Sequence, residues 1–216
     1  MLLAAHQLPA QLKSVPVYAV TAARPGWAAA LDYGSGINQA SGHARHWGAR
    51  AAGGFGRLQV ALAAGVWDAG ASASAQFGGT ALLRALGKPS GGLALHALAG
   101  AGYARAGAGS SATTYVTVPL GVAVVHSGFH TSRGALTPWL TSRVEIVREA
   151  FAGFRPSQAG VGVSGGVAAA VRGRLGAHVA LEWLKLFERR GAGVTLSGGD
   201  RITAGVGVHV LLSGTP

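Results

Sequence analysis

The chain has 216 residues, a formal net charge of +11, 36 glycines and no cysteine. A chain of this length fits one domain, and the lack of cysteine excludes disulfide bonds and thiolate chemistry. Because each glycine within a helix costs about 1 kcal/mol relative to alanine, a mostly helical fold is not expected.

The hydrophobic residues are distributed singly along the chain. They make up 49% of the sequence, and the mean hydropathy is positive. No run of about 18 uncharged apolar residues occurs, which argues against a transmembrane helix. Apolar residues instead alternate with small or polar ones, a period of two that is typical of β-strands in membrane barrels and in soluble β-sandwiches.

Residues 1–25 carry Pro9, Pro16 and Pro25 and show no regular pattern, so they are expected to form an irregular N-terminal extension. No secretory signal is visible in this segment, because polar residues interrupt its short apolar start and no basic segment precedes it. From residue 26 to residue 212 the pattern predicts an antiparallel up-and-down barrel of about ten strands, with eight and twelve as alternatives. The expected strands are 26–36, 43–53, 57–66, 72–86, 93–102, 115–124, 136–149, 158–170, 174–187 and 201–212. Residues 213–216 are expected to form a short tail.

The choice between a membrane barrel and a soluble one depends on the two faces of each strand. In the last strand Ile202, Val206 and Val208 share one face, and Thr203 and Gly207 lie on the other. A face that points to water would carry many more charges, whereas only 12% of this chain is charged. The pattern therefore favours an apolar face toward lipid and a small, polar face toward the lumen.

Turn lengths and aromatic residues agree with this interpretation. Expected short turns alternate with longer connections, as in bacterial barrels with short periplasmic turns and long external loops; 127–134 and 67–72 are exceptions. Aromatic residues gather near strand ends, where membrane-interface girdles would place them. The expected interface aromatics are Trp27, Tyr33, Trp47, Trp67, Tyr103, Trp139 and Trp183.

From Leu31 to Leu212 the chain resembles the small outer-membrane β-barrel domain families of Gram-negative bacteria. The segments Thr80–Leu86, Leu95–Arg105 and Pro138–Arg148 (PWLTSRVEIVR) carry this resemblance, which is one of pattern. It implies a porin-like membrane protein located in the bacterial outer membrane. The chain departs from these families at its end, where Val210–Leu211–Leu212 and four further residues replace the usual terminal aromatic.

Polar residues on the inward face are expected to form a packed network in a mostly filled lumen. Glu145 and Glu182 would neutralise nearby arginines, because an unpaired buried charge is costly. The expected network comprises Arg50, Arg84, His96, Arg143, Glu145, His178, Glu182 and His209. The alternative is a narrow anion-tolerant pore, for which the arginines would make the lumen electropositive and inward-facing glycines would leave open volume.

A third hypothesis is an outer-membrane lipid hydrolase. His126–Ser127 and His130–Ser132 superficially resemble the His–Ser pair of lipid A deacylases, but they fall at an expected periplasmic turn with no nearby carboxylate in sequence. No catalytic residue is therefore assigned, and the chain is not expected to be an enzyme. The inward histidines lack close ligand spacing, so neither a metal nor another cofactor is expected.

The predicted role is therefore structural, surface-interacting or self-assembling. The expected partners are outer-membrane lipid and lipopolysaccharide, and copies of the protein itself through the barrel wall. The basic residues are dispersed along the chain without forming a basic helix, so nucleic acid is not expected as a partner.

Overall fold

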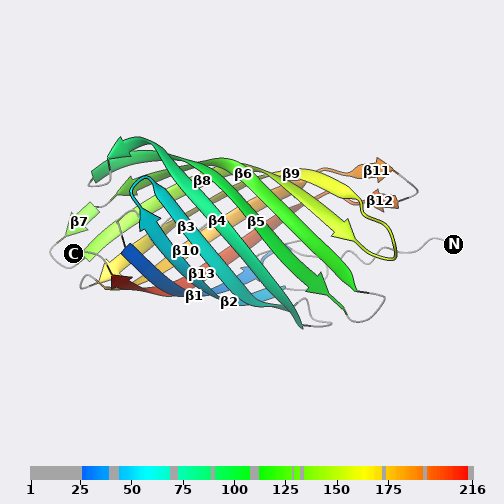
Figure 1. Ribbon diagram of the computed structural model, residues 1–216, viewed down its shortest axis with the longest axis horizontal. Coiled ribbons are helices and arrows are strands. Elements are labelled where there is room, and N and C mark those ends of the chain that lie inside the picture. The colour runs from blue at the N-terminus through cyan, green and yellow to red at the C-terminus, as the bar shows by residue number, and fades with distance from the viewer. Residues whose placement is uncertain are drawn as a thin grey trace.

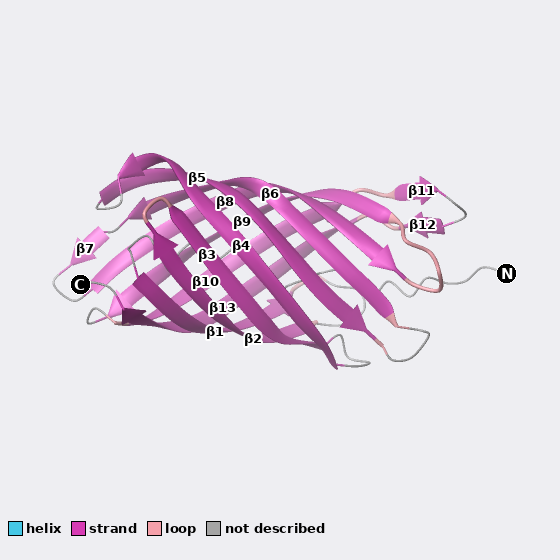
Figure 2. Cartoon of the chain, viewed as in Figure 1, coloured by secondary structure: helices cyan, strands magenta, loops and turns pink. Residues whose placement is uncertain are grey.

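The computed structural model describes residues 26–38, 44–68, 73–88, 91–107, 112–127, 129–131, 134–171, 174–191 and 194–213. The expected extension at 1–25 and residues 214–216 of the expected tail lie outside this part of the chain. Within it, ten long strands form one antiparallel sheet that closes on itself, which confirms the predicted fold (Figure 1). The described residues contain no helix, and so none that could cross a membrane (Figure 2).

The ten strands of the barrel agree with the segments predicted from the alternating pattern. They are β1 (Gly26–Gly36), β2 (Arg45–Phe55), β3 (Leu58–Asp68), β4 (Ala73–Lys88), β5 (Gly91–Ala106), β6 (Thr113–Ser127), β8 (Gly134–Ala150), β9 (Ser157–Val171), β10 (Leu175–Leu186) and β13 (Gly199–Ser213). Three short strands were not predicted: β7 (Phe129–Thr131), β11 (Arg189–Gly191) and β12 (Val194–Leu196). β7 pairs with the start of β8, and β11 and β12 form a hairpin between β10 and β13.

Two strand pairings close the meander into a barrel. β6 pairs with β8, and β1 pairs with β13, so that each long strand has two neighbours. Closure gives each of the ten long strands a hydrogen-bonded neighbour on both sides, so that none of them is an open sheet edge, as a membrane-spanning sheet requires.

The seam between the first and last strands can be tested with an engineered disulfide. Leu31 of β1 lies directly opposite Val208 of β13, and both side chains are exposed on the outer face. Opposite residues in antiparallel strands have Cα atoms about 4.5–5.5 Å apart, within the range of a disulfide. Leu31→Cys with Val208→Cys is expected to cross-link on oxidation, giving a heat-denatured chain that migrates faster on a non-reducing gel. Leu31→Cys with Leu140→Cys, on β8, is the matched control; cross-linking of that pair instead would contradict the closure.

The connections define two ends of the barrel. We call the end with the start of β1, the end of β13 and the two-residue β2–β3 turn the turn end. The opposite end, which carries the β8–β9 connection and the β11–β12 hairpin, is called the loop end (Figure 1). In outer-membrane barrels the short turns are periplasmic and the long loops external.

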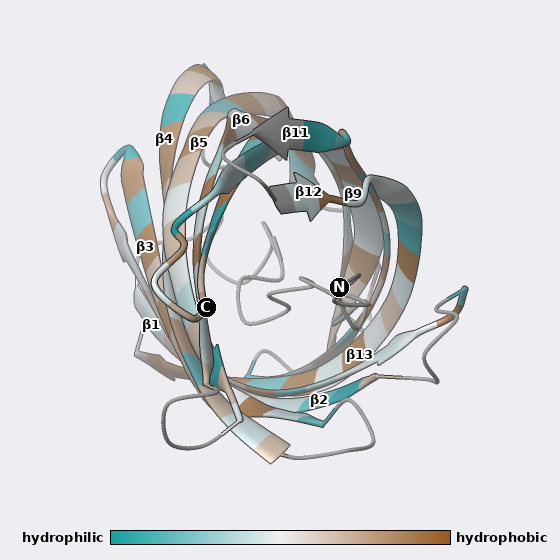
Figure 3. Ribbon diagram, turned by 90° about the vertical axis from the view of Figure 1, so that its right-hand side faces the viewer, coloured by the Kyte–Doolittle hydropathy of each residue, from teal (hydrophilic) through white to brown (hydrophobic). Residues whose placement is uncertain are grey.

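The outer surface of the barrel is apolar. Leu31, Leu62, Leu140 and Val179 are each more than half exposed, and many other large hydrophobic side chains lie on the same face of their strands. Figure 3 shows the resulting alternation of hydrophobic and polar residues along the strands of the ring. A contiguous apolar surface around a closed barrel is the lipid-facing belt of outer-membrane-type barrels, as the sequence predicted.

The interior is packed in layers, and β8 passes through all of them. From the turn end, its buried inward residues are Trp139, Thr141, Arg143, Glu145 and Val147. Trp139 belongs to an apolar cluster toward the turn end, which also contains Leu82, Leu98, Ala123, Val125 and Ala168. Val147 belongs to a second apolar cluster toward the loop end, with Ala44, Trp67, Ala104, Ala106, Tyr115, Leu184 and Leu186. Arg143 and Glu145 therefore lie between two apolar layers.

Candidate functional site in the barrel interior

The first group of interior polar residues joins four strands. Arg50 of β2 donates from Nε to Asp32 Oδ2 of β1 at 3.0 Å, and from Nη2 to Asp32 Oδ1 at 3.2 Å. His178 of β10 contacts the same carboxylate, with Nε2 2.8 Å from Oδ1. The ring of His209, on β13, stacks on that of His178 with centroids 5.7 Å apart. All four side chains are buried, so the carboxylate and the guanidinium compensate each other within the barrel.

The second group is centred on Arg143 of β8. Its Nε donates to Glu145 Oε2 at 2.9 Å, and its Nη2 lies 3.1 Å from Glu182 Oε1 of β10. Arg201 of β13 interacts electrostatically with Glu145 and with Glu149, at the loop end of β8. Glu145 and Glu182 therefore pair with an arginine, as the sequence predicted.

A third interior contact is a hydrogen bond between uncharged side chains of β2 and β4, which reaches across the intervening strand β3. Gln76 of β4 donates from Nε2 to His46 Nδ1 of β2, and both side chains are buried. Gly65 of β3 lies between them, and a Cβ at this position would come within 2.7 Å of the His46 ring. The contact therefore depends on a strand that presents no side chain at this point.

Three further inward-facing glycines make room for the side chains of neighbouring strands. The guanidinium of Arg143 lies over Gly162 of β9, where an added Cβ would be 3.0 Å from Cζ. At Gly166 a Cβ would be 2.8 Å from the Trp139 ring, and at Gly176 it would be 2.3 Å from His209 Nε2. The hypothesis that such glycines leave open volume is therefore wrong at these positions, because large side chains from adjacent strands occupy the space.

Among the residues that the structure describes, the acidic and basic side chains inside the barrel compensate one another. Asp32, Glu145, Glu149 and Glu182 account for four of the seven acidic residues of the sequence. They face Arg50, Arg143 and Arg201, and Arg84 lies beside His96 nearer the turn end. An electropositive lumen, which the pore hypothesis required, is therefore not favoured, and the excess positive charge of the chain lies outside this network.

The prediction that seven aromatic residues lie at the membrane interface was wrong for two of them. Trp67 and Trp139 are buried in the barrel interior, 2% and 5% exposed, and cannot contact lipid headgroups from the outer wall. The alternation itself contained the signal: Val66 and Leu140, their neighbours in sequence, lie on the apolar face, which puts both tryptophans inward. Trp27, Trp47, Tyr103 and Trp183 are exposed on the outer wall, and Tyr33 packs beside Trp47 with ring centroids 4.4 Å apart.

Sequence reasoning missed Asp32, Arg201, His46 and Glu149 as interior residues. Asp32 had the clearest signal, because an acidic residue in the middle of a strand with outward Leu31 and Tyr33 must face the lumen. The His–Ser pairs considered for hydrolysis fall at the turn end, where the side chains of Ser127, His130 and Ser132 lie outside the described residues. In the part of the chain that the structure describes, no group of three or more His, Asp or Glu side chains is arranged to hold a metal ion.

Comparison with known proteins extends the fold assignment. No family model and no curated protein sequence matches the chain. Among solved structures, the translocator domain of autotransporter NalP from Neisseria meningitidis superposes with a TM-score of 0.50 at 12% identity, covering 92% of each chain. The beta domain of the Bordetella autotransporter BrkA gives 0.48 at 13% identity over 86% of this chain and 98% of that one.

Neisserial surface protein A gives a TM-score of 0.40 at 15% identity, over 87% of this chain and 97% of that one. Likeness at these identities concerns the fold alone. The likeness to the NalP translocator domain, at a TM-score of 0.50, agrees with the closed antiparallel sheet and its apolar outer wall, which together are the architecture of outer-membrane-type β-barrels.

Proposed function

We propose that the protein is a non-conducting structural barrel of the outer membrane, whose own side chains fill its lumen. The observation that carries this proposal is the layered interior, in which compensated charges lie between two apolar clusters. An ion crossing the barrel would have to pass Trp139, Arg143 and Tyr115, each buried among neighbours from other strands. A narrow barrel is readily filled by its side chains, and about eight strands leave room for little else.

Single-channel recording tests this proposal directly. Protein refolded into micelles and inserted into planar lipid bilayers is expected to show no conductance steps in simple salt solutions. A heat-dependent mobility shift of the same preparation on a detergent gel is the control, because it shows that the barrel is folded. Regular steps with anion selectivity would overturn the proposal and support the pore hypothesis.

The surface-interaction and self-assembly roles remain predictions. No catalytic site is assigned, and the interior network fits a structural role because each buried carboxylate has a basic partner within the barrel. The outer wall and its loop end are therefore the regions where a specific interaction is to be sought.

A further inference from the structure

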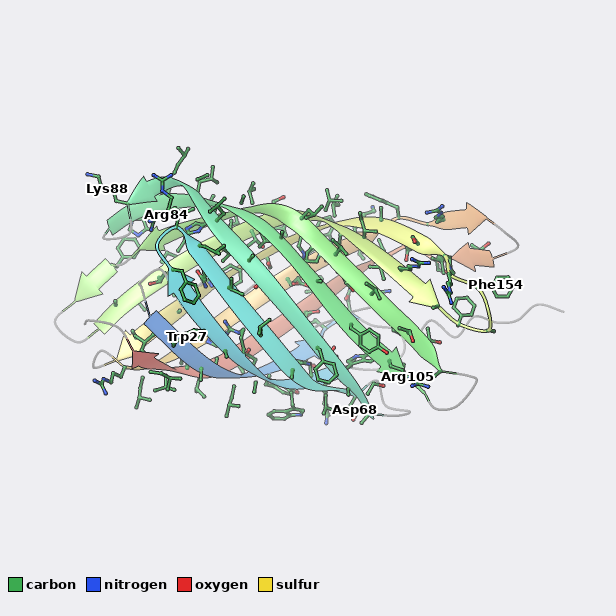
Figure 4. All side chains as sticks on the ribbon, viewed as in Figure 1. Trp27, Asp68, Arg84, Lys88, Arg105 and Phe154 are labelled. Atoms are coloured by element: carbon green, nitrogen blue, oxygen red, sulfur yellow. The ribbon has the colours of Figure 1, made fainter. Side chains whose placement is uncertain are left out.

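Four basic side chains of the outer wall lie near the loop end. Arg45 on β2, Arg105 on β5, Arg148 on β8 and Lys185 on β10 are all exposed and occupy outward positions of their strands. Figure 4 shows Arg105 at this end together with Asp68 and Phe154, whereas Arg84 and Lys88 lie at the opposite end. These four residues differ in the charge of their cross-strand neighbours.

The strand register separates these four residues into two kinds. Arg45 lies directly opposite Asp68, and Lys185 lies directly opposite Asp200, so each has an acidic cross-strand neighbour. Opposite charges in such positions attract, and the local charge is largely compensated. The other two residues have uncharged cross-strand neighbours: Arg105 lies opposite Thr114, and Arg148 lies between Val116 and Ser157.

Arg155 adds a third basic group to the same side of the barrel. The hairpin between β8 and β9 is closed by two backbone hydrogen bonds between Phe151 and Phe154, of 3.1 and 2.8 Å. Strand alternation then puts exposed Arg155 next to Ala150, on the same face as Arg148. We call Arg105, Arg148 and Arg155 the cationic patch.

The patch has the dimensions of a lipid headgroup. It extends across β5, β6, β8 and β9, which is three strand spacings or about 14 Å. Tyr103, Val116 and Arg148 form one row across three strands, and Arg105 lies in the next row toward the loop end. Tyr103 is 42% exposed on this wall, where an amphipathic ring marks the boundary between hydrocarbon and headgroups.

Neighbouring charges leave the patch positive. Glu149 points to the interior, where it interacts with Arg201. Glu188 lies on the far side of β9, beside Arg189, whose Nη1 donates to the Ser157 carbonyl oxygen at 2.7 Å. Arginine favours phosphate because its planar guanidinium can donate two parallel hydrogen bonds.

From this arrangement we propose that the cationic patch binds the phosphate groups of a phosphorylated glycolipid in the outer leaflet. The inference rests on the proposed membrane placement, with the loop end external, but not on whether the lumen conducts. The acyl chains would cover the apolar wall below the patch, formed by Val116, Leu120 and Val144, and the phosphates would lie among the three guanidinium groups.

The test compares how tightly the barrel in micelles binds phosphorylated and dephosphorylated lipid A. Binding is measured as the rise in the unfolding temperature of the barrel when each lipid is added. The wild-type barrel is expected to respond to the phosphorylated lipid only. A triple variant, Arg105→Gln with Arg148→Gln and Arg155→Gln, should bind the phosphorylated lipid about 100-fold more weakly. Each basic group near an anionic surface contributes a similar share of the binding free energy, and three shares add up to about this factor. The matched control is Arg45→Gln with Lys185→Gln, which removes two compensated charges and should change the affinity little.

Three results would overturn the proposal. One is an equal response to lipid without phosphates, which would show that the acyl chains alone bind. Another is an equal response to inorganic phosphate, which would indicate a soluble anion. The third is an equal loss of affinity in the control variant, which would indicate a diffuse effect of net charge. A heat-dependent gel shift of each variant shows whether it still folds, and single-channel recording separately tests the structural role.

Discussion

Replacing Arg143 with methionine is expected to destabilise the barrel by about 3–5 kcal/mol, the usual cost of removing one partner from a buried charge network. The guanidinium contacts both Glu145 and Glu182, and its side chain is 3% exposed. Its loss leaves two carboxylates in an interior where water cannot fully solvate them. The free energy of unfolding in urea, measured for the barrel refolded in micelles, is the measurement.

Two further variants show whether the effect comes from uncompensated charge. Arg148→Met changes an exposed arginine on the same strand, and it should alter the stability by less than about 0.5 kcal/mol. Arg143→Met combined with Glu145→Gln and Glu182→Gln removes the stranded charges, and most of the lost stability should return. If the triple variant were as unstable as the single one, packing of the arginine stem would be the cause and the charge argument would be wrong.

Replacing Gly207 with alanine should cost about 1–3 kcal/mol, as overpacking of a filled core usually does. A Cβ at this position would lie 2.5 Å from His178 Nε2 and 2.6 Å from Asp32 Oδ1. The methyl group would therefore separate the two atoms whose contact joins β1 to β10. Arg50 holds the carboxylate from the other side, so the pair cannot simply move away.

A double-mutant cycle identifies the contact responsible for this effect. In a His178→Ala background the ring is absent and Asp32 can move toward the vacated space, so Gly207→Ala should cost less than it does in the wild-type barrel. Gly199→Ala on the same strand is the control, because a Cβ there would meet nothing within 4 Å. Equal costs in both backgrounds would show that the methyl group acts through Asp32 or the strand itself and not through the His178 ring.

The amino-acid sequence by itself determined the strands and their two faces. Alternation of apolar with small or polar residues requires only that each strand be extended, because successive side chains of a strand point to opposite sides. The ten long strands, the lipid-facing wall and the inward direction of Arg143, Glu145 and His178 follow from that local rule. The same rule also applied to Trp67 and Trp139, and their misplacement came from giving the clustering of aromatics more weight than the alternation.

Only the tertiary structure decided which inward residues meet. Asp32 and His178 are 146 positions apart and lie on strands separated by β13, so their contact depends on barrel closure and register. The role of the glycines was hidden for the same reason, since the side chain that covers Gly162 or Gly207 belongs to another strand. Alternation is a property of one strand, whereas pairing, filling and charge compensation are properties of neighbouring strands, and closure of the barrel sets them.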